Sequence, residues 1–421
     1  MEDSDSSSSN RSYRVLVTRN ITLTAIRGFS GGLEVIYFKV YLGISAINLG
    51  YLSSIFSLTI LSSILVCGWI SDKYGRKRIF IIGSLLSSLS YLLLFLANNW
   101  YLLVVVYILS ALSSSLISPA LEYLLGVLTD RKNRCTSIAT MSVLVNIMNI
   151  IVPPLGAYII SIAGGIQYIK HIFLIQFIAS IVVLIYILKK LEVKEVLTNE
   201  HNHLNPLKTL LQGFMEMRDL LKSSNARIIL QIVLISALAW SLPGPYWRLY
   251  AYEVCKTPTY LMGLLATAQS LTYSIFSIPI SRRADGGRKK DIIMKLRMFY
   301  WFSVISLLIA GTVETPYNYI VPILAWALWG IGATLSSAWR SLAIESVPEE
   351  WLARWNSLRN FSYYLVAIPC YLLSGYLWNL DPRLPFSLAL VIDLIMTVTL
   401  LPRISEQSKS KLQSSRILNF K

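Results

Sequence analysis

Long apolar runs, separated by short polar breaks, extend along most of the chain. An α-helix needs about 20 apolar residues to cross a bilayer, and runs of that length predict six crossings in the first part of the chain. They lie at about 20–42, 48–70, 79–97, 101–128, 136–163 and 170–188. Six more lie at about 227–253, 260–280, 292–312, 318–345, 356–378 and 385–402. The pattern therefore predicts an all-α membrane protein with twelve transmembrane helices.

Polar stretches at both ends and in the middle predict how these helices are grouped. We expect a disordered tail over 1–19, a six-helix half over 20–188, a linker over 189–225, a second six-helix half over 226–402 and a tail over 403–421. The first ten residues, MEDSDSSSSN, are acidic and Ser-rich. Such a segment lacks the apolar side chains that packing requires, and this is why we expect it to be disordered.

The charge balance argues against a water-soluble enzyme. Charged residues make up 14% of the chain and apolar residues 55%, whereas about 25% of a soluble domain is charged. The net charge is +16, but 30 of the 38 Lys and Arg residues lie in segments that an even number of crossings places on one side. Lys and Arg concentrate on the cytoplasmic side of membrane proteins. We therefore expect a plasma-membrane protein with both termini in the cytoplasm and no nucleic-acid partner.

Residue patterns that carry covalent chemistry or hold a metal are missing from the sequence. The four cysteines lie far apart and form no CxxC pair, so they suggest neither a disulfide framework nor a zinc site. His201 and His203 have no third ligand nearby, and a solvated loop is their simpler interpretation. The chain has neither a P-loop nor a DDxxD motif. We expect no enzymatic activity, no ATP-driven transport, no metal and no cofactor.

The two halves of the chain resemble each other weakly. A shift of 213 residues places the segment 48–52 (NLGYL) on 261–265 (LMGLL) and Asp72 on Asp285, without a gap. Two six-helix halves in the same orientation imply a pseudo-two-fold axis along the membrane normal. The solute path then lies between the halves, near the middle of the membrane.

The polar break after the second predicted helix carries a specific motif. Residues 68–78 read GWISDKYGRKR, and the break after the eighth helix reads SRRADGGRKK over 281–290. The first stretch resembles motif A of the major facilitator superfamily, G-x-x-x-D-x-x-G-R-[KR]-[KR], and the second keeps its Asp and basic run. With twelve helices and a central linker, the resemblance covers essentially the whole chain. It implies a secondary transporter whose two halves rock around a central site.

Motif A suggests a contact that holds the cytoplasmic ends of the halves together. Gly68 permits close approach of helices, Gly75 permits a tight turn, and Asp72 can pair with a helix N-terminus or an Arg. The resemblance implies that such a latch closes in the outward-open state. Its expected members are Gly68, Asp72, Gly75, Arg76, Lys77 and Arg134, with Asp285, Arg288, Glu345 and Arg354 as counterparts in the second half. The alternative is that the basic run only fixes the topology.

Ionisable residues inside predicted helices mark candidate sites, since each costs about 2.5–3.5 kcal/mol at the bilayer centre. Arg27 and Glu34 are seven residues apart, so on one continuous helix they share a face that we expect to line the cavity. The 213-residue shift places Arg248 beside Glu34, where an ion pair across the pseudo-axis is possible. The charge on Glu34 would then depend on conformation. Glu34 or Glu122 is our candidate proton carrier, and Asp393 is a less favoured alternative.

Two further groups of residues are candidates for the solute cavity. Pro243, Gly244 and Pro245 should break the seventh helix, which suits a helix that lines a cavity. The aromatic residues Trp240, Tyr246 and Trp247 surround this break and either face the cavity or form an interfacial belt. Asn146 and Asn149 in the fifth helix belong to a stretch that resembles a degenerate copy of the family's antiporter motif. They either donate hydrogen bonds to a solute or satisfy backbone freed by proline.

These features together favour proton-coupled export of a small organic solute by a monomer in the lipid bilayer, with the proton gradient as the energy source. A sugar or organic-acid symporter or facilitator is an alternative within the same class. A membrane sensor that transports nothing is the alternative from another class.

Overall fold

The computed structural model describes residues 2–30, 32–129, 134–192, 224–285, 289–312, 318–347 and 352–404, and these residues are almost entirely helical. The first half consists of α1 (Glu2–Ser30), α2 (Glu34–Val40), α3 (Ala46–Tyr74), α4 (Arg76–Leu96), α5 (Trp100–Leu128), α6 (Arg134–Ile162), the short turn η1 (Ile166–Tyr168) and α7 (Ile169–Lys190). The second consists of α9 (Ser224–Ser241), α10 (Trp247–Glu253), α11 (Thr259–Asp285), α12 (Lys289–Ala310), α13 (Val321–Ala333), α14 (Leu335–Glu345), α15 (Leu352–Leu380), α16 (Leu384–Thr399) and the turn η3 (Leu401–Arg403).

The twelve predicted membrane crossings are confirmed. Ten segments of the described residues are long and apolar enough to span a bilayer. The eleventh crossing is α1 followed by α2, and the twelfth is α15. At about 1.5 Å per residue, α1 and α15, with 29 residues each, exceed the 30 Å of a hydrocarbon core. Both carry charged residues, such as Arg27 and Arg359, and neither is among those ten apolar segments.

The internal repeat is visible in the helix boundaries. The short helices α2 and α10 have seven residues each, and they begin 213 residues apart, at Glu34 and Trp247. The helices α3 and α11 begin at Ala46 and Thr259, again 213 residues apart. The first and seventh crossings are therefore broken at equivalent places, and the predicted break of the seventh crossing is confirmed.

The break in the first crossing corrects the expectation of one continuous helix over 20–42. The helix α1 ends at Ser30, and Gly32 has a φ of 108°, a value that L side chains rarely adopt. A new helix then begins at Glu34. The argument that Arg27 and Glu34 share one face of a regular helix is therefore wrong.

The beginning of the chain also differs from expectation, because α1 starts at Glu2, inside the segment 1–19 that we expected to be disordered. Val15 and Leu16 are buried against Phe80 of α4 and Leu124 of α5. Apolar residues in the second part of this segment thus anchor the helix, which the Ser-rich composition of the first part did not indicate. The linker beyond Glu192 and the tail beyond Ile404 lie outside the described residues.

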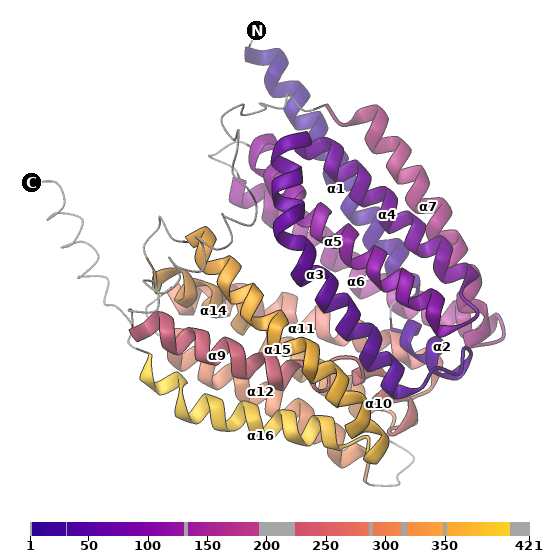
Figure 1. Ribbon diagram of the computed structural model, residues 1–421, viewed down its shortest axis with the longest axis vertical. Coiled ribbons are helices and arrows are strands. Elements are labelled where there is room, and N and C mark those ends of the chain that lie inside the picture. The colour runs from indigo at the N-terminus through magenta and orange to yellow at the C-terminus, as the bar shows by residue number, and fades with distance from the viewer. Residues whose placement is uncertain are drawn as a thin grey trace, which may run out of the picture.

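The two halves form a V (Figure 1). They diverge toward the face on which α1 begins and α16 ends, here called the terminal face, and they meet near α2 and α10 at the opposite face. The clusters of buried apolar residues are divided between the halves in the same way. One cluster near α2 and α10 contains residues of both halves, such as Tyr37 and Trp326, whereas the clusters nearer the terminal face belong to one half each.

Close backbone contacts join the halves toward the opposite face. The contacts run between α3 and α15 and between α6 and α11. A Cβ atom added to Gly50 would lie 2.4 Å from the carbonyl oxygen of Tyr371, and one added to Gly263 would lie 2.3 Å from that of Pro153. Gly50 and Gly263 occupy equivalent positions in the repeat. The missing side chains therefore allow the halves to close at this face.

Candidate functional site

A cavity of about 980 Å³ lies between the halves on the terminal side of the shared core. Its walls come from α1, α4, α5 and α6, while Arg248 of α10 and Tyr273 of α11 are the lining residues from the second half. A second cavity of about 490 Å³ shares Asn146, Arg248 and Tyr273 with the first. The two cavities therefore adjoin at these three residues. The helices around them diverge toward the terminal face (Figure 1).

Among the described residues, three arginines and one glutamate line the larger cavity, and these charged side chains sum to about +2. The guanidinium of Arg19 lies 4.8 Å from the centre of the Phe80 ring, and Arg19 Nη1 donates to Asn20 Oδ1 over 2.7 Å. Arg27 Nε donates to the hydroxyl of Tyr91 over 2.8 Å. Among the described residues, both arginines thus have neutral partners and no carboxylate within ion-pair distance.

The carboxylate of Glu34 is positioned by two buried polar residues. Ser30 Oγ donates to Glu34 Oε1 over 2.7 Å, and Gln176 Nε2 donates to Ser30 Oγ over 2.6 Å and to the carbonyl oxygen of Ile26 over 3.0 Å. Glu34 is also the first residue of α2, where the helix dipole favours a negative charge. The break after Ser30 therefore turns the carboxylate into the cavity and holds it there.

The guanidinium of Arg248 lies beside the break between helices α1 and α2 of the first half. A Cβ atom on Gly32 would lie 3.3 Å from Arg248 Nε and 3.4 Å from Cζ, so the absent side chain leaves room for the guanidinium. Glu34 acts electrostatically on Arg248. Among the described residues, however, no carboxylate lies within 4 Å of Arg248. The ion pair with Glu34 that the repeat suggested is not formed in this conformation, although both residues line the same cavity.

The aromatic residues around the seventh-helix break pack in the core that both halves share, where the Tyr246 hydroxyl donates to the carbonyl oxygen of Ala46 over 2.7 Å. Tyr246 and Trp247 are buried, and the Trp247 ring stacks on Trp329 at 4.4 Å between centres. Trp240 stacks on Tyr300 at 4.7 Å. The three candidates are not among the residues that line the two cavities. They belong to the packed core around α10, which is neither of the two placements that the sequence suggested.

The remaining polar candidates separate into two groups. Asn146 lines both cavities and Asn149 lines the smaller one. Glu122 on α5 is exposed and does not belong to the lining of either cavity. The structure thus brings Arg27, Glu34, Asn146 and Arg248 together around one space and leaves Glu122 apart from them.

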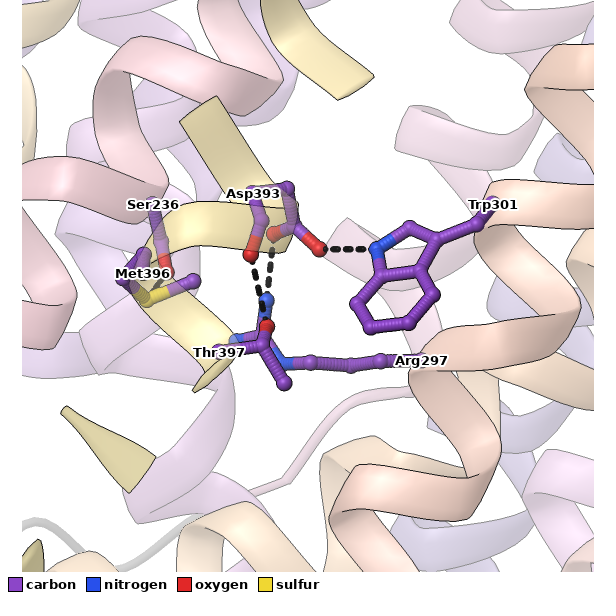
Figure 2. A network of polar contacts seen from close by, with 6 residues as sticks. All are labelled: Ser236, Arg297, Trp301, Asp393, Met396 and Thr397. Atoms are coloured by element: carbon purple, nitrogen blue, oxygen red, sulfur yellow. Dashed lines mark hydrogen bonds and ion pairs between the residues drawn. The ribbon is translucent and has the colours of Figure 1, made fainter. Parts of the chain in front are cut away.

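Asp393 belongs to a separate buried network in the second half (Figure 2). Its carboxylate forms an ion pair with Arg297 of α12 and accepts a hydrogen bond from Trp301 Nε1 over 2.8 Å. The Asp393 side chain is fully buried, and that of Arg297 is 6% exposed. This geometry favours a structural role for Asp393, which joins α16 to α12.

The motif A region is described in part. Gly75 has a φ of 93° between α3 and α4, as a tight turn requires, and Gly68 lies within α3. The guanidinium of Arg76 lies 3.9 Å from the centre of the Tyr123 ring, and Lys77 is partly buried in α4. In the second half, Glu345 pairs with Lys289. The side chains of Asp72, Arg134, Asp285, Arg288 and Arg354 lie outside the described residues, so the latch stays a prediction.

Several residues of the site had escaped sequence interpretation. Arg19, Tyr91, Tyr273 and several serines line the cavity, whereas Ser30 and Gln176 hold Glu34 without belonging to the lining. Two signals pointed to some of these residues. Gln176 is a lone amide in an otherwise apolar helix, and a lone amide there needs a polar partner. Ser110, Ser113, Ser114 and Ser118 follow helical spacing, which marks one polar face of α5.

Comparisons with known proteins agree with this architecture. The sequence profile described as the Major Facilitator Superfamily matches residues 16–242 and 229–419. The chain is 27% identical over 210 residues to multidrug resistance protein 2 of Bacillus subtilis (strain 168), a match that covers 49% of each protein. It is 22% identical over 306 residues to the quinolone resistance protein NorA of Staphylococcus aureus (strain MSSA476), covering 71% of each. The chain thus spans about half the length of the first relative.

Solved structures share the fold at low sequence identity. A mutant form of the nucleoside transporter NupG superposes with a TM-score of 0.75 and 12% identity, covering 94% of this chain and 100% of the other. A peptide transporter POT in complex with sulfate superposes with a TM-score of 0.67 and 17% identity, covering 93% and 95%. From its profile match, which extends across both halves, the chain belongs to the Major Facilitator Superfamily of multi-pass membrane transporters.

Proposed function

We propose that this protein is a proton-coupled secondary transporter that exports a small organic solute by alternating access. The observation that carries the proposal is the cavity between the halves, which lies on the terminal side of the shared core, where the two halves diverge (Figure 1). When the open end of the cavity closes and the closed end opens, such a site is exposed first to one side of the membrane and then to the other. No covalent step is needed for this function.

Both termini lie in the cytoplasm in this proposal, and the membrane is the plasma membrane. The bias of Lys and Arg toward the loops on the terminal side supports the orientation. The cavity then faces the cytoplasm, which is the conformation in which an exporter loads its solute. The names of the two bacterial relatives, which refer to resistance, also favour export. The protein works as a monomer, since each chain holds both halves that form the cavity.

Glu34 is the proposed proton carrier. It is the one carboxylate among the residues that line the cavity, and it lies on a helix break beside two arginines. Its single described hydrogen bond comes from Ser30, and a hydroxyl can turn to accept as well as donate. The site can therefore hold either the charged or the protonated carboxyl without rearrangement of its neighbours.

The test is proton flux in proteoliposomes that contain a pH-sensitive dye. On addition of a transported solute, the natural protein is expected to change the internal pH. Glu34→Gln should abolish solute-driven proton flux because the Gln amide cannot take up and release a proton as a carboxyl group does. Glu122→Gln, which removes an exposed carboxyl outside the cavity, is the matched control and should retain it. Coupling that persists in both single variants and in the double variant would exclude both carboxyls as proton carriers.

A symporter of a sugar or organic acid is the second candidate, because the same cavity offers arginines and hydroxyl groups. The sign of the pH change separates the two mechanisms. Exchange moves protons against the direction of the solute, whereas symport moves both together. Labelled-solute uptake without any pH change would instead indicate a facilitator, and no movement of any solute would indicate a sensor.

A further inference from the structure

We infer that the solute of this transporter is a hydroxylated organic anion, whose carboxylate or phosphate group binds between Arg27 and Arg248. The inference rests on the proposed transport function and names its substrate class. It starts from the charge of the cavity, where the described lining residues include Arg19, Arg27 and Arg248 but a single carboxylate, Glu34. When guanidinium groups outnumber carboxylates in a cavity between membrane-spanning helices, the site favours a ligand that carries negative charge.

The position of Arg248 gives the anion a defined place to bind. The guanidinium lies over Gly32 and lines both cavities, and none of the described residues places a carboxylate within 4 Å of it. Arg27 uses Nε for Tyr91, so its two terminal nitrogens remain for a ligand. A guanidinium fork matches the two oxygens of a carboxylate or phosphate. Arg27 comes from the first half and Arg248 from the second, so an anion between them would contact both moving halves.

Serine hydroxyls around these arginines explain why the anion should also carry hydroxyl groups. Seven serines line the larger cavity: Ser87, Ser90, Ser110, Ser113, Ser114, Ser118 and Ser142. Ser90 donates to the carbonyl oxygen of Leu86, Ser113 to that of Gly83, and Ser114 to that of Ser110. Once its proton is committed to the backbone, each of these oxygens is left as an acceptor. Such acceptors fit the O–H donors of a polyhydroxylated solute.

The lining is unsuited to a lipophilic cation. An organic cation is recognised by aromatic faces and by carboxylates, yet the larger cavity is lined by two aromatic residues, Tyr91 and Tyr273, and by one acid. Trp247, Trp326 and Trp329 pack against one another in the core instead. The charge of the site, and not its size, therefore selects the solute.

Binding to the purified full-length protein tests the inference with ligands that share a skeleton and differ in charge. Glucuronate, glucose and glucosamine share a pyranose ring and carry charges of −1, 0 and +1. Glucose 6-phosphate replaces the carboxylate by a phosphate, and tetraphenylphosphonium represents a lipophilic cation. We expect glucuronate or glucose 6-phosphate to bind at least about tenfold more tightly than glucose, since hydrogen bonds to charged groups are the stronger ones. The better of the two shows which oxyanion the site prefers.

Arginine variants locate the anion in the cavity. Arg27→Gln and Arg248→Gln should each weaken binding of the preferred anion about 10- to 100-fold, and Arg248→Lys should restore part of the loss. Arg403→Gln, which removes an exposed arginine outside the cavity, should change nothing. Binding of glucosamine or tetraphenylphosphonium as tight as that of the anions would overturn the inference, and so would unchanged anion binding in both Gln variants or no binding of either anion to folded protein.

Proton flux in proteoliposomes separates this inference from the proposed function. Flux driven by cationic or neutral solutes, with no response to the anions, would contradict the substrate class while leaving the transporter in place. Anion binding without flux of any solute would contradict transport while leaving the binding site in place.

Discussion

Replacing Asp393 by leucine is expected to lower the free energy of unfolding in detergent by about 3–5 kcal/mol, the cost of breaking a buried ion pair from one side. The variant leaves the guanidinium of Arg297 buried without its countercharge, and it removes the acceptor of Trp301 Nε1. Figure 2 shows that all three side chains meet between α12 and α16. Unfolding followed by tryptophan fluorescence measures the loss.

A second variant shows whether charge or packing is responsible. Arg297→Met combined with Asp393→Leu replaces the pair by apolar side chains and should recover most of the stability. Val391→Leu, an exposed position on the same helix, is the control and should change stability by less than about 0.5 kcal/mol. If the double variant unfolds as easily as Asp393→Leu alone, the unpaired charge of Arg297 is not the cause of the lost stability. Retained proton coupling in the double variant would confirm that Asp393 is not the proton carrier.

Gly263→Ala is expected to shift the protein toward conformations that are open at the face opposite the termini. The new methyl group would lie 2.3 Å from the carbonyl oxygen of Pro153 and 2.6 Å from two further atoms of Pro153 and Pro154, and these are backbone atoms that cannot rotate away. Overpacking of this kind costs about 1–3 kcal/mol in the closed state. The ratio of open to closed molecules should therefore rise about 5- to 150-fold.

Distances between spin labels at Tyr101 and Leu380 measure this shift in a variant without native cysteines. Both positions are highly exposed, one at the start of α5 and the other at the end of α15, so they belong to different halves near the closed face. Gly126→Ala is the matched control, since its methyl group would have no heavy atom within 4 Å. Gly50→Ala, at the equivalent place in the repeat, should act like Gly263→Ala. Equal distance distributions in all four proteins would show that these glycines do not set the closed state.

Hydrophobic patterning predicted the number of crossings and the repeat because the bilayer imposes length and apolarity on each crossing separately. The break in the seventh crossing was predictable from Pro243, Gly244 and Pro245, which remove backbone donors or permit unusual angles. The equivalent break before Glu34 carries no proline. Its sequence signal was the pair Gly31 and Gly32, which composition alone does not distinguish from ordinary helix-packing glycines.

The neutral polar residues of the site were harder to predict than its charged residues. Arg27, Glu34 and Arg248 were found because a charge in a membrane helix is costly wherever it lies. Ser30 and Gln176 are neutral, and their importance comes from contacts across about 150 residues of chain that no local pattern reveals. Trp247 shows the opposite error. A large aromatic residue fits a cavity wall, a membrane interface or a core equally well, and only its packing against Trp326 and Trp329 identifies the core.

The shared core around Tyr37, Tyr246 and Trp326 has a thermal consequence. To open the protein at that face, water must reach apolar and aromatic surface that is now buried, and hydration of apolar surface raises the heat capacity. The open and closed conformations should then differ in heat capacity. The free-energy difference between them is therefore a curved function of temperature and not a straight line. Transport rates measured over a wide temperature range are accordingly expected to deviate from a straight Arrhenius line, even while every molecule stays folded.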